Sequence, residues 1–185
     1  MVMVAVVGSH SEEPPDAEAL GSWLAGRQVH LLTGGGPGVM EAVCKGFAHA
    51  SQRLGSSIAI LPVGKDGKLK SGYPNQWVEI SIYTHLHGQK NADGSGGEAP
   101  EGVFSRNHIN ARSAHVMVAF TGGPGTLAEV DLALKLQKPV LALPSGKGID
   151  GKDGTGLMKH FGPLAARLKT FSDLQTLQVA LREFL

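Results

Sequence analysis

Cysteine is nearly absent from this sequence, which has Cys44 as its only cysteine among 185 residues. A single cysteine cannot form a disulfide within the chain, and structural zinc sites need several cysteine or histidine ligands. We therefore expect no internal disulfide, no metal site and a reducing compartment, the cytoplasm. Cys44 falls near the apolar stripe of a predicted helix and is interpreted as a packing residue, not as a nucleophile.

Net charge and aromatic residues are also scarce, with a formal charge of +1 and an aromatic share of 5%. Proteins that bind nucleic acids or anionic membranes normally cluster many Lys and Arg side chains, so neither partner is expected. The apolar segment 1–8 is too short to cross a bilayer and is interpreted as a buried strand. With 42% hydrophobic residues, residues 1–185 are expected to form one domain around an aliphatic core.

Glycine is the residue in excess, with 26 copies against roughly 13 expected at the usual share of about 7%. Two clusters stand between a predicted strand and a predicted helix: Gly34-Gly35-Gly36-Pro37-Gly38 and Gly122-Gly123-Pro124-Gly125. Backbone N–H groups in such loops approach anions closely, and the N-terminus of the following helix adds positive potential. Together, the two loops predict a phosphate-binding site.

Apolar strands and amphipathic helices alternate along the chain. Strands are predicted at residues 2–7, 29–32, 57–63, 77–83, 115–120 and 139–143. Helices are predicted at residues 16–26, where Asp16 is expected to be the cap, at 39–54, 103–113 and 126–137, and from a capping box at Ser172–Gln175 to Leu185. This order is typical of a Rossmann-like, doubly wound α/β fold with a mainly parallel sheet flanked by helices. Such sheets bind ligands beyond the carboxyl ends of their strands, where both glycine loops are expected.

The common nucleotide-binding fingerprints are missing. The Walker A pattern Gly-x-x-x-x-Gly-Lys-Ser/Thr does not occur, and the first strand ends in Gly8-Ser9-His10 instead of a Gly-x-Gly-x-x-Gly loop. ATP hydrolysis and ordinary NAD binding are therefore disfavoured. No lysine stands in a recognisable pyridoxal-phosphate setting, so pyridoxal-phosphate chemistry is not expected.

Two longer segments resemble the signatures of the LOG-like proteins of the SLOG superfamily, which are often mislabelled lysine decarboxylases. The segment Gly34-Gly-Gly-Pro-Gly-Val-Met40 is similar to the family element Gly-Gly-Gly-x-x-Gly-Leu-Met. The segment Thr121-Gly-Gly-Pro-Gly-Thr-Leu-Ala-Glu129 is similar to the element Pro-Gly-Gly-x-Gly-Thr-x-x-Glu. Arg106 and Arg112 on the preceding helix also fit the family pattern, and the resemblance covers nearly the whole chain.

The resemblance implies a phosphoribohydrolase, which cleaves the N-glycosidic bond of a nucleoside 5′-monophosphate to a free base and ribose 5-phosphate. It implies Arg106 and Glu129 as catalytic residues, with Glu129 stabilising the ribosyl cation or activating water. From its position near a helix start alone, Glu129 is more readily explained as a partner of the helix dipole. The resemblance also implies that no metal or organic cofactor is needed, and it implies a homodimer or tetramer. The expected ligand- and phosphate-binding residues are Gly8, Ser9, Gly34, Gly35, Gly36, Gly38, Met40, Arg112, Thr121, Gly122, Gly123, Gly125 and Thr126.

Three residues depart from the hydrolase pattern and leave an alternative open. Thr121 replaces a proline, Ala128 replaces a common second acid, and Asn107 replaces the lysine that usually follows the arginine. Asn107 together with Asn110 is more similar to a sister branch that includes predicted nucleotide-binding proteins and molybdenum cofactor carrier proteins. The alternative is a non-catalytic carrier of a nucleotide or a molybdopterin-type ligand. A regulatory sensor of a nucleotide would use the same pocket.

Three histidines stand at the ends of predicted strands. His85 and His87 could face one side of a strand end, but without a third ligand they are interpreted as solvated loop residues and not as a metal site. His10 is interpreted as a turn residue, with a place in the pocket as the alternative. Residues 85–102 are expected to cover the base, and no pattern in them identifies it.

Overall fold

The computed structural model describes residues 1–63, 68–69, 71–84, 86 and 105–185. Its strands are β1 (Val2–Val7), β2 (Val29–Thr33), β3 (Ser57–Pro62), β4 (Ile80–Thr84), β5 (Val116–Phe120), β6 (Val140–Leu143) and β7 (Leu168–Thr170). Its helices are α1 (Pro15–Ala25), α2 (Val39–His49), α3 (Arg106–Ser113), α4 (Pro124–Lys135), α5 (Gly154–Phe161) and α6 (Leu174–Leu181), with 3-10 turns η1 (Gly162–Arg167) and η2 (Arg182–Phe184). No helix among these residues is both long and apolar enough to cross a membrane.

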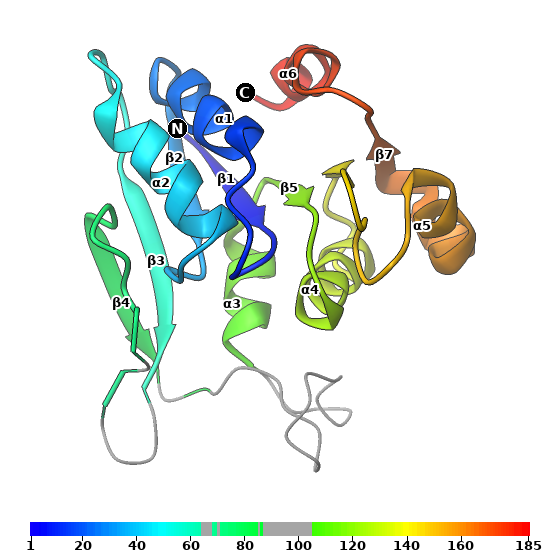
Figure 1. Cartoon of the computed structure of the whole chain (residues 1–185), viewed down its shortest axis with the longest axis horizontal. Coiled ribbons are helices and arrows are strands. Elements are labelled where there is room, and N and C mark those ends of the chain that lie inside the picture. Colours follow the sequence, from blue (N-terminus) through cyan, green and yellow to red (C-terminus); the bar gives the residue numbers. More distant parts are fainter. Residues whose placement is uncertain (64–67, 70, 85, 87–104) are drawn as a thin grey trace.

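The strands form one seven-stranded sheet in the order β4-β3-β2-β1-β5-β6-β7. Every neighbouring pair is parallel. β1 therefore lies in the middle, with β2 on one side and β5 on the other (Figure 1). This arrangement confirms the predicted Rossmann-like α/β fold.

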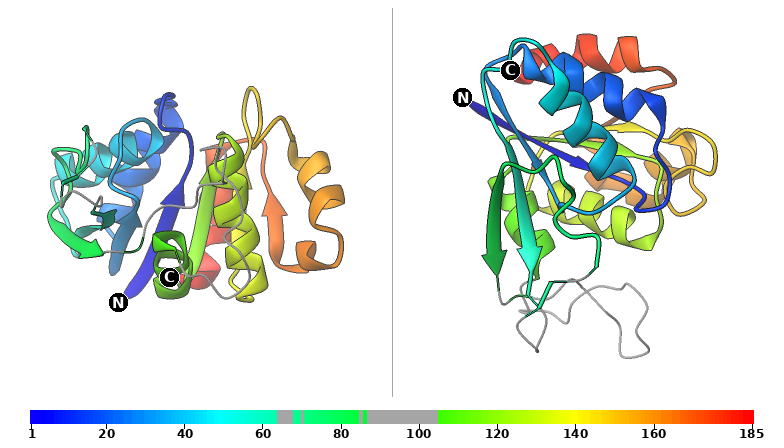
Figure 2. Two further views of the ribbon diagram at one scale, coloured as in Figure 1. Left: turned by 90° about the horizontal axis from the view of Figure 1, so that it is seen from below. Right: turned by 60° about the vertical axis from the view of Figure 1, so that its left-hand side comes forward.

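Helices cover both faces of the sheet (Figure 2). Val4 and Val6 of β1 pack in a core beneath α1, α2 and α6, whereas Ala5 and Val7 pack in a second core beneath α3, α4 and α5. Successive side chains of a strand point to opposite faces, so a strand covered on both faces must be apolar at every position. This requirement explains the unbroken apolar run at the start of the chain.

Several predicted boundaries were wrong. Helix α2 ends at His49, and Leu54 is 53% exposed instead of contributing to the core. The chain leaves the helix because Ala50 is extended, which begins the return to β3. Strand β4 starts at Ile80 because the preceding residues, including Trp77, form a turn. Helix α5 and strand β7 were not predicted, since α5 opens with a glycine-rich turn and β7 has only three residues.

The expected helix caps were also displaced. Asp16 lies inside α1 because Pro15 occupies the first helical turn, where a missing N–H costs nothing. Asp173, not Ser172, caps α6, and its carboxylate accepts a hydrogen bond from the N–H of Thr176 at 2.9 Å. A one-residue shift of this kind is within the usual uncertainty of helix ends.

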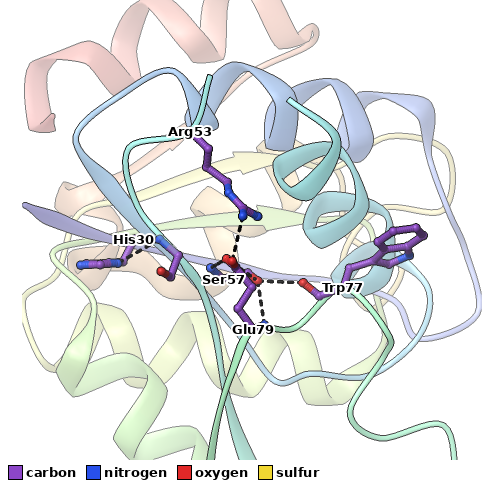
Figure 3. A network of polar contacts seen from close by, with 6 residues as sticks. His30, Arg53, Ser57, Trp77 and Glu79 are labelled. Carbon is purple, nitrogen blue, oxygen red and sulfur yellow. Dashed lines mark hydrogen bonds and ion pairs between the residues drawn. The ribbon is translucent and has the colours of Figure 1, made fainter. Parts of the chain in front are cut away.

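A polar network joins the amino ends of β3 and β4 (Figure 3). The Glu79 carboxylate accepts a hydrogen bond from the N–H of Ser57 at 2.9 Å and pairs with the Arg53 guanidinium at 2.8 Å. The Ser57 hydroxyl donates to the carbonyl of Trp77 at 2.8 Å. The network ties the edge strand β4 to the sheet, at the end opposite to the glycine loops.

We expect Glu79→Ala to lower the free energy of unfolding by about 1–2 kcal/mol, because the buried Ser57 N–H loses its charged acceptor. Urea denaturation measures this change. The matched control is Glu183→Ala, which removes the ion pair with Lys169. In that pair the Lys169 side chain is 53% exposed and the Glu183 side chain is 62% exposed. We expect it to change stability by less than about 0.5 kcal/mol. Equal losses in the two variants would contradict a special role for Glu79.

Candidate functional site

A pocket of about 590 Å³ opens at the carboxyl ends of β1 and β5. β1 pairs with β2 on one side and with β5 on the other, so the connections of the fold diverge at this point. Open α/β sheets bind ligands at such a point, and the volume is that of a small-molecule site.

Ten of the predicted site residues line this pocket. They are Gly8, Ser9, Met40, Arg106, Thr121, Gly122, Gly123, Gly125, Thr126 and Glu129. Five do not line it: Gly34, Gly35, Gly36, Gly38 and Arg112. The remaining lining residues are His10, Ser11, Glu12, Tyr73, Asn107, Pro124, Lys147, Gly148, Asp150 and Gly151. Of these, His10 was foreseen only as an alternative to a plain turn residue.

The loops that follow β1 and β5 touch through their backbones. The N–H of Ser9 donates to the carbonyl of Thr121 at 2.8 Å. A Cβ on Gly8 would lie 2.8 Å from the Val39 side chain, and a Cβ on Gly122 would collide with Thr126. Glycine is therefore required at both positions for the two loops and their helices to close around the pocket.

The N-terminus of α4 forms one wall of the pocket. Gly123 is the residue before the helix, Pro124 opens it, and the Thr126 side chain is buried in its first turn. A Cβ on Gly123 or Gly125 would meet no atom within 4 Å, so open space lies over this turn. Unpaired N–H groups and the helix dipole make such a turn favourable for a phosphate.

A loop after β6 completes this wall and supplies residues that the sequence patterns missed. The N–H of Gly122 donates to the carbonyl of Gly148 at 3.1 Å, and the N–H of Asp150 donates to the carbonyl of Gly122 at 2.7 Å. These bonds bring Lys147 and Asp150 into the lining. The cluster of glycines at residues 146–151 was the available signal, but by itself it predicts only a turn.

The first glycine loop supports the pocket from behind. The Arg106 guanidinium donates to the carbonyls of Gly34 at 3.3 Å and Ile60 at 3.4 Å. A Cβ on Gly34 would collide with that guanidinium, and one on Gly36 would collide with the ring of Tyr73. Close packing therefore accounts for these glycines, and through it the loop positions Arg106 and Tyr73, both of which line the pocket.

Glu129 faces α3 from the second turn of α4. Although its side chain keeps some exposure toward the pocket, the surrounding protein raises the pKa of its carboxyl, while the charge of Arg106 and the amide of Asn110 lower it. Burial is the larger effect. A carboxyl with two such neighbours is a candidate functional group.

Several buried polar atoms around Glu129 have no hydrogen-bond partner among the described residues. They are Nε of Arg106, Oδ1 of Asn107 and both amide atoms of Asn110. Asn110 approaches Glu129 closely enough to lower its pKa, but not with the geometry of a hydrogen bond. Each such group costs about 1–3 kcal/mol when left unpaired, and in native proteins it usually indicates a water or a ligand group.

The other candidates lie away from the pocket. Arg112 is exposed near the C-terminal end of α3. Cys44 is fully buried, its Sγ lies 3.8 Å from Oγ1 of Thr33, and burial raises the pKa of its thiol to about 11. Such a thiol stays protonated at neutral pH, which agrees with a packing role. His85 and His87 lie outside the described residues, and no three His, Cys, Asp or Glu side chains converge within the described part of the chain.

We expect Gly122→Ala to destabilise the protein by about 1–3 kcal/mol, because the new methyl group collides with Thr126. Gly123→Ala is the matched control next to it. Its methyl group would meet no atom, so a change below about 0.5 kcal/mol is expected. Thermal denaturation of both variants without ligand measures the difference. If Gly122→Ala were as stable as the wild type, the close fit of these loops would be disproved.

Known proteins with this architecture include binders of the molybdenum cofactor. The chain is 29% identical to the molybdenum cofactor binding protein of Rippkaea orientalis, with a TM-score of 0.69 over 98% of this chain and 94% of that one. It is 30% identical to the molybdenum cofactor carrier protein of Chlamydomonas reinhardtii, with a TM-score of 0.69 over 100% and 98% of the two chains.

A similar sequence also occurs in an archaeon. An uncharacterized protein of Archaeoglobus fulgidus is 30% identical over 154 residues, which make up 82% of this chain and 85% of that one. The model of the SLOG cluster4 family matches residues 1–160, which include every residue of the pocket. The chain therefore belongs to the SLOG cluster4 family, in agreement with the LOG-like resemblance of its glycine motifs.

Proposed function

We propose that this protein binds a small phosphorylated ligand of the nucleotide or molybdopterin type and carries it without cleaving it. The observation that supports this most directly is the open N-terminal turn of α4 in the pocket wall, where Gly123 and Gly125 leave room for a phosphate. Backbone N–H groups of this turn would hold the phosphate. The Thr126 hydroxyl and the Lys147 ammonium border the same space and would add a donor and a positive charge.

The role of a carrier is supported by the position of Arg106, one of the two predicted catalytic residues. The Arg106 guanidinium donates to two backbone carbonyls and thereby braces the first glycine loop. The overall similarity to a molybdenum cofactor carrier and a molybdenum cofactor binding protein points in the same direction.

A phosphoribohydrolase is the second candidate. It is favoured by one specific observation, namely that Arg106 and Glu129 line the same pocket as the phosphate-binding turn. In such an enzyme the ionised carboxylate would be the active form. Because the pKa of Glu129 is raised, hydrolysis would be weak at low pH and would increase as the pH rises through that pKa.

Two measurements on the same samples separate the candidates. The protein is incubated with AMP, GMP, CMP and UMP, released ribose 5-phosphate is quantified, and the melting temperature is recorded with each ligand. A carrier is expected to be stabilised by at least one ligand in proportion to its concentration, because ligand that binds only the native state raises its stability. No ribose 5-phosphate is expected.

Glu129→Gln tests the alternative, with the remote surface change Glu183→Gln as its control. Release of ribose 5-phosphate by the wild type and by Glu183→Gln, but not by Glu129→Gln, would establish a hydrolase and contradict the carrier. Failure of every phosphorylated ligand to stabilise the protein would contradict binding altogether.

A further inference from the structure

Helices α3 and α4 lie side by side on one face of the sheet (Figure 1). We call the side chains of Arg106, Asn107, Asn110 and Glu129 the polar recess: three of them line the pocket, and Asn110 lies beside Glu129. Arg106, Asn107 and Asn110 come from the first turns of α3, and Glu129 comes from α4. Asn107 is 7% exposed and Asn110 is 1% exposed. This recess is distinct from the phosphate-binding turn, which precedes it along α4.

The unpaired atoms of the recess point to a ligand. Oδ1 of Asn107 lacks a hydrogen-bond partner among the described residues, and Asn107 lines the pocket. Both amide atoms of Asn110 lack a partner as well, although the side chain lies beside Glu129. In native proteins buried polar atoms of this kind are normally hydrogen-bonded. Apolar side chains at these positions would carry no unpaired polar atoms. Polar contacts in a free site often reach good geometry only when the ligand arrives.

We infer that Glu129 and Asn107 recognise the 2-amino-4-oxo edge of a fused heterocycle, the edge that guanine and pterin share, and that Asn110 positions Glu129 for this contact. The inference rests on the proposed function, since it assumes a phosphorylated ligand anchored at the start of α4. It adds the class of ring that the ligand carries.

The chemistry of a carboxylate favours this edge. An ionised carboxylate only accepts hydrogen bonds, and its two oxygens match two parallel N–H donors. A ring N–H beside an amino group presents two such donors, and the second hydrogen of that amino group can be donated to the unpaired Oδ1 of Asn107. Adenine presents an amino group beside a ring nitrogen that has a lone pair, so one carboxylate oxygen would face an acceptor. Hypoxanthine has the ring N–H but no amino group.

The spacing along α4 fits a ligand of this size. Glu129 follows Gly123 by six residues, which is about 9 Å along a helix axis at about 1.5 Å per residue. A phosphate at the start of the helix and a ring edge at Glu129 are therefore separated by about the length of a mononucleotide or a pterin phosphate. Met40 and Tyr73, which also line the pocket, supply apolar surface beside the ring.

Calorimetric titration of the full chain with GMP, IMP and AMP tests the inference, with 6-hydroxymethylpterin monophosphate as the pterin probe. We expect GMP to bind at least about tenfold more tightly than IMP or AMP, a size of preference that one well-matched polar contact provides. The titration with the pterin phosphate then shows which source of the shared edge is preferred. Because both rings carry the edge, the pterin phosphate is also expected to bind more tightly than IMP or AMP.

Three variants separate recognition from anchoring. Glu129→Gln, which keeps the shape of the side chain, is expected to reduce the preference for GMP over IMP to about threefold or less. Thr126→Val is the matched control on the same helix, and it is expected to weaken all three nucleotides by a similar factor and to preserve the ratio. Asn110→Leu is expected to reduce the ratio without lowering the melting temperature of the free protein, because it removes an amide that has no partner.

The outcomes that overturn the inference differ from those that overturn the proposed function. Equal dissociation constants for GMP, IMP and AMP, or an unchanged preference in Glu129→Gln, would show that the recess does not recognise this edge while binding itself stands. A lower melting temperature of Asn110→Leu with an unchanged preference would show that Asn110 is a structural residue only. Absence of binding by all the nucleotides and by the pterin phosphate would overturn the proposed function, and this inference with it.

Discussion

The site of this protein depends on the backbone contact between the loops that follow β1 and β5. The N–H of Ser9 donates to the carbonyl of Thr121 at 2.8 Å, which holds the ends of two neighbouring parallel strands together beyond the sheet. Gly8 and Gly122 permit this contact, because a Cβ on Gly8 would collide with Val39 of α2 and a Cβ on Gly122 would collide with Thr126 of α4. This backbone contact therefore positions the start of α4 and the pocket beside it.

The same geometry divides the pocket into two chemically different ends. At the start of α4, glycines, backbone N–H groups and Lys147 form an end suited to a phosphate. Further along α4, Glu129 lies beside Arg106 and Asn110, Asn107 lines the same pocket, and all three α3 residues have unpaired buried polar atoms. An anchored phosphate would direct the remainder of its ligand toward this recess. Specificity would then come from the recess and most of the affinity from the phosphate, since a phosphate is recognised without regard to the ring attached to it.

The sequence predicted the fold well because strands buried on both faces have a simple pattern. The apolar run of β1 and the glycine clusters after β2 and β5 were sufficient to place the central strands and the second glycine loop. Strand β7 and helix α5 were missed, because the strand is short and the helix begins with the poor helix formers Gly154 and Gly156. β7 is positioned by its pairing with β6, and α5 is positioned by burial of Leu157 and Phe161 in the core beneath α3 and α4. Local patterns encode neither contact.

The residues predicted for the site fall into two groups in the structure: ten line the pocket and five do not. The two glycine loops looked equivalent in the sequence, yet only Gly122, Gly123 and Gly125 line the pocket, while Gly34 and Gly36 pack against Arg106 and Tyr73. Lys147 and Asp150 lie on a loop whose backbone is hydrogen-bonded to Gly122, and no sequence motif predicts this contact. Tertiary packing decides whether the space beside a glycine is open to the pocket or is filled by a side chain of the protein.

The central claim is that a phosphorylated ligand binds at the switch point between β1 and β5. The most direct measurement is a titration of the ¹⁵N-labelled protein with GMP, followed by amide chemical shifts. The account predicts that the largest and saturable shifts occur at Gly8, Ser9 and the amides of residues 122–126, with smaller shifts at Gly34 and Gly36. Shifts concentrated in the first glycine loop, or spread over the surface without saturation, would contradict it.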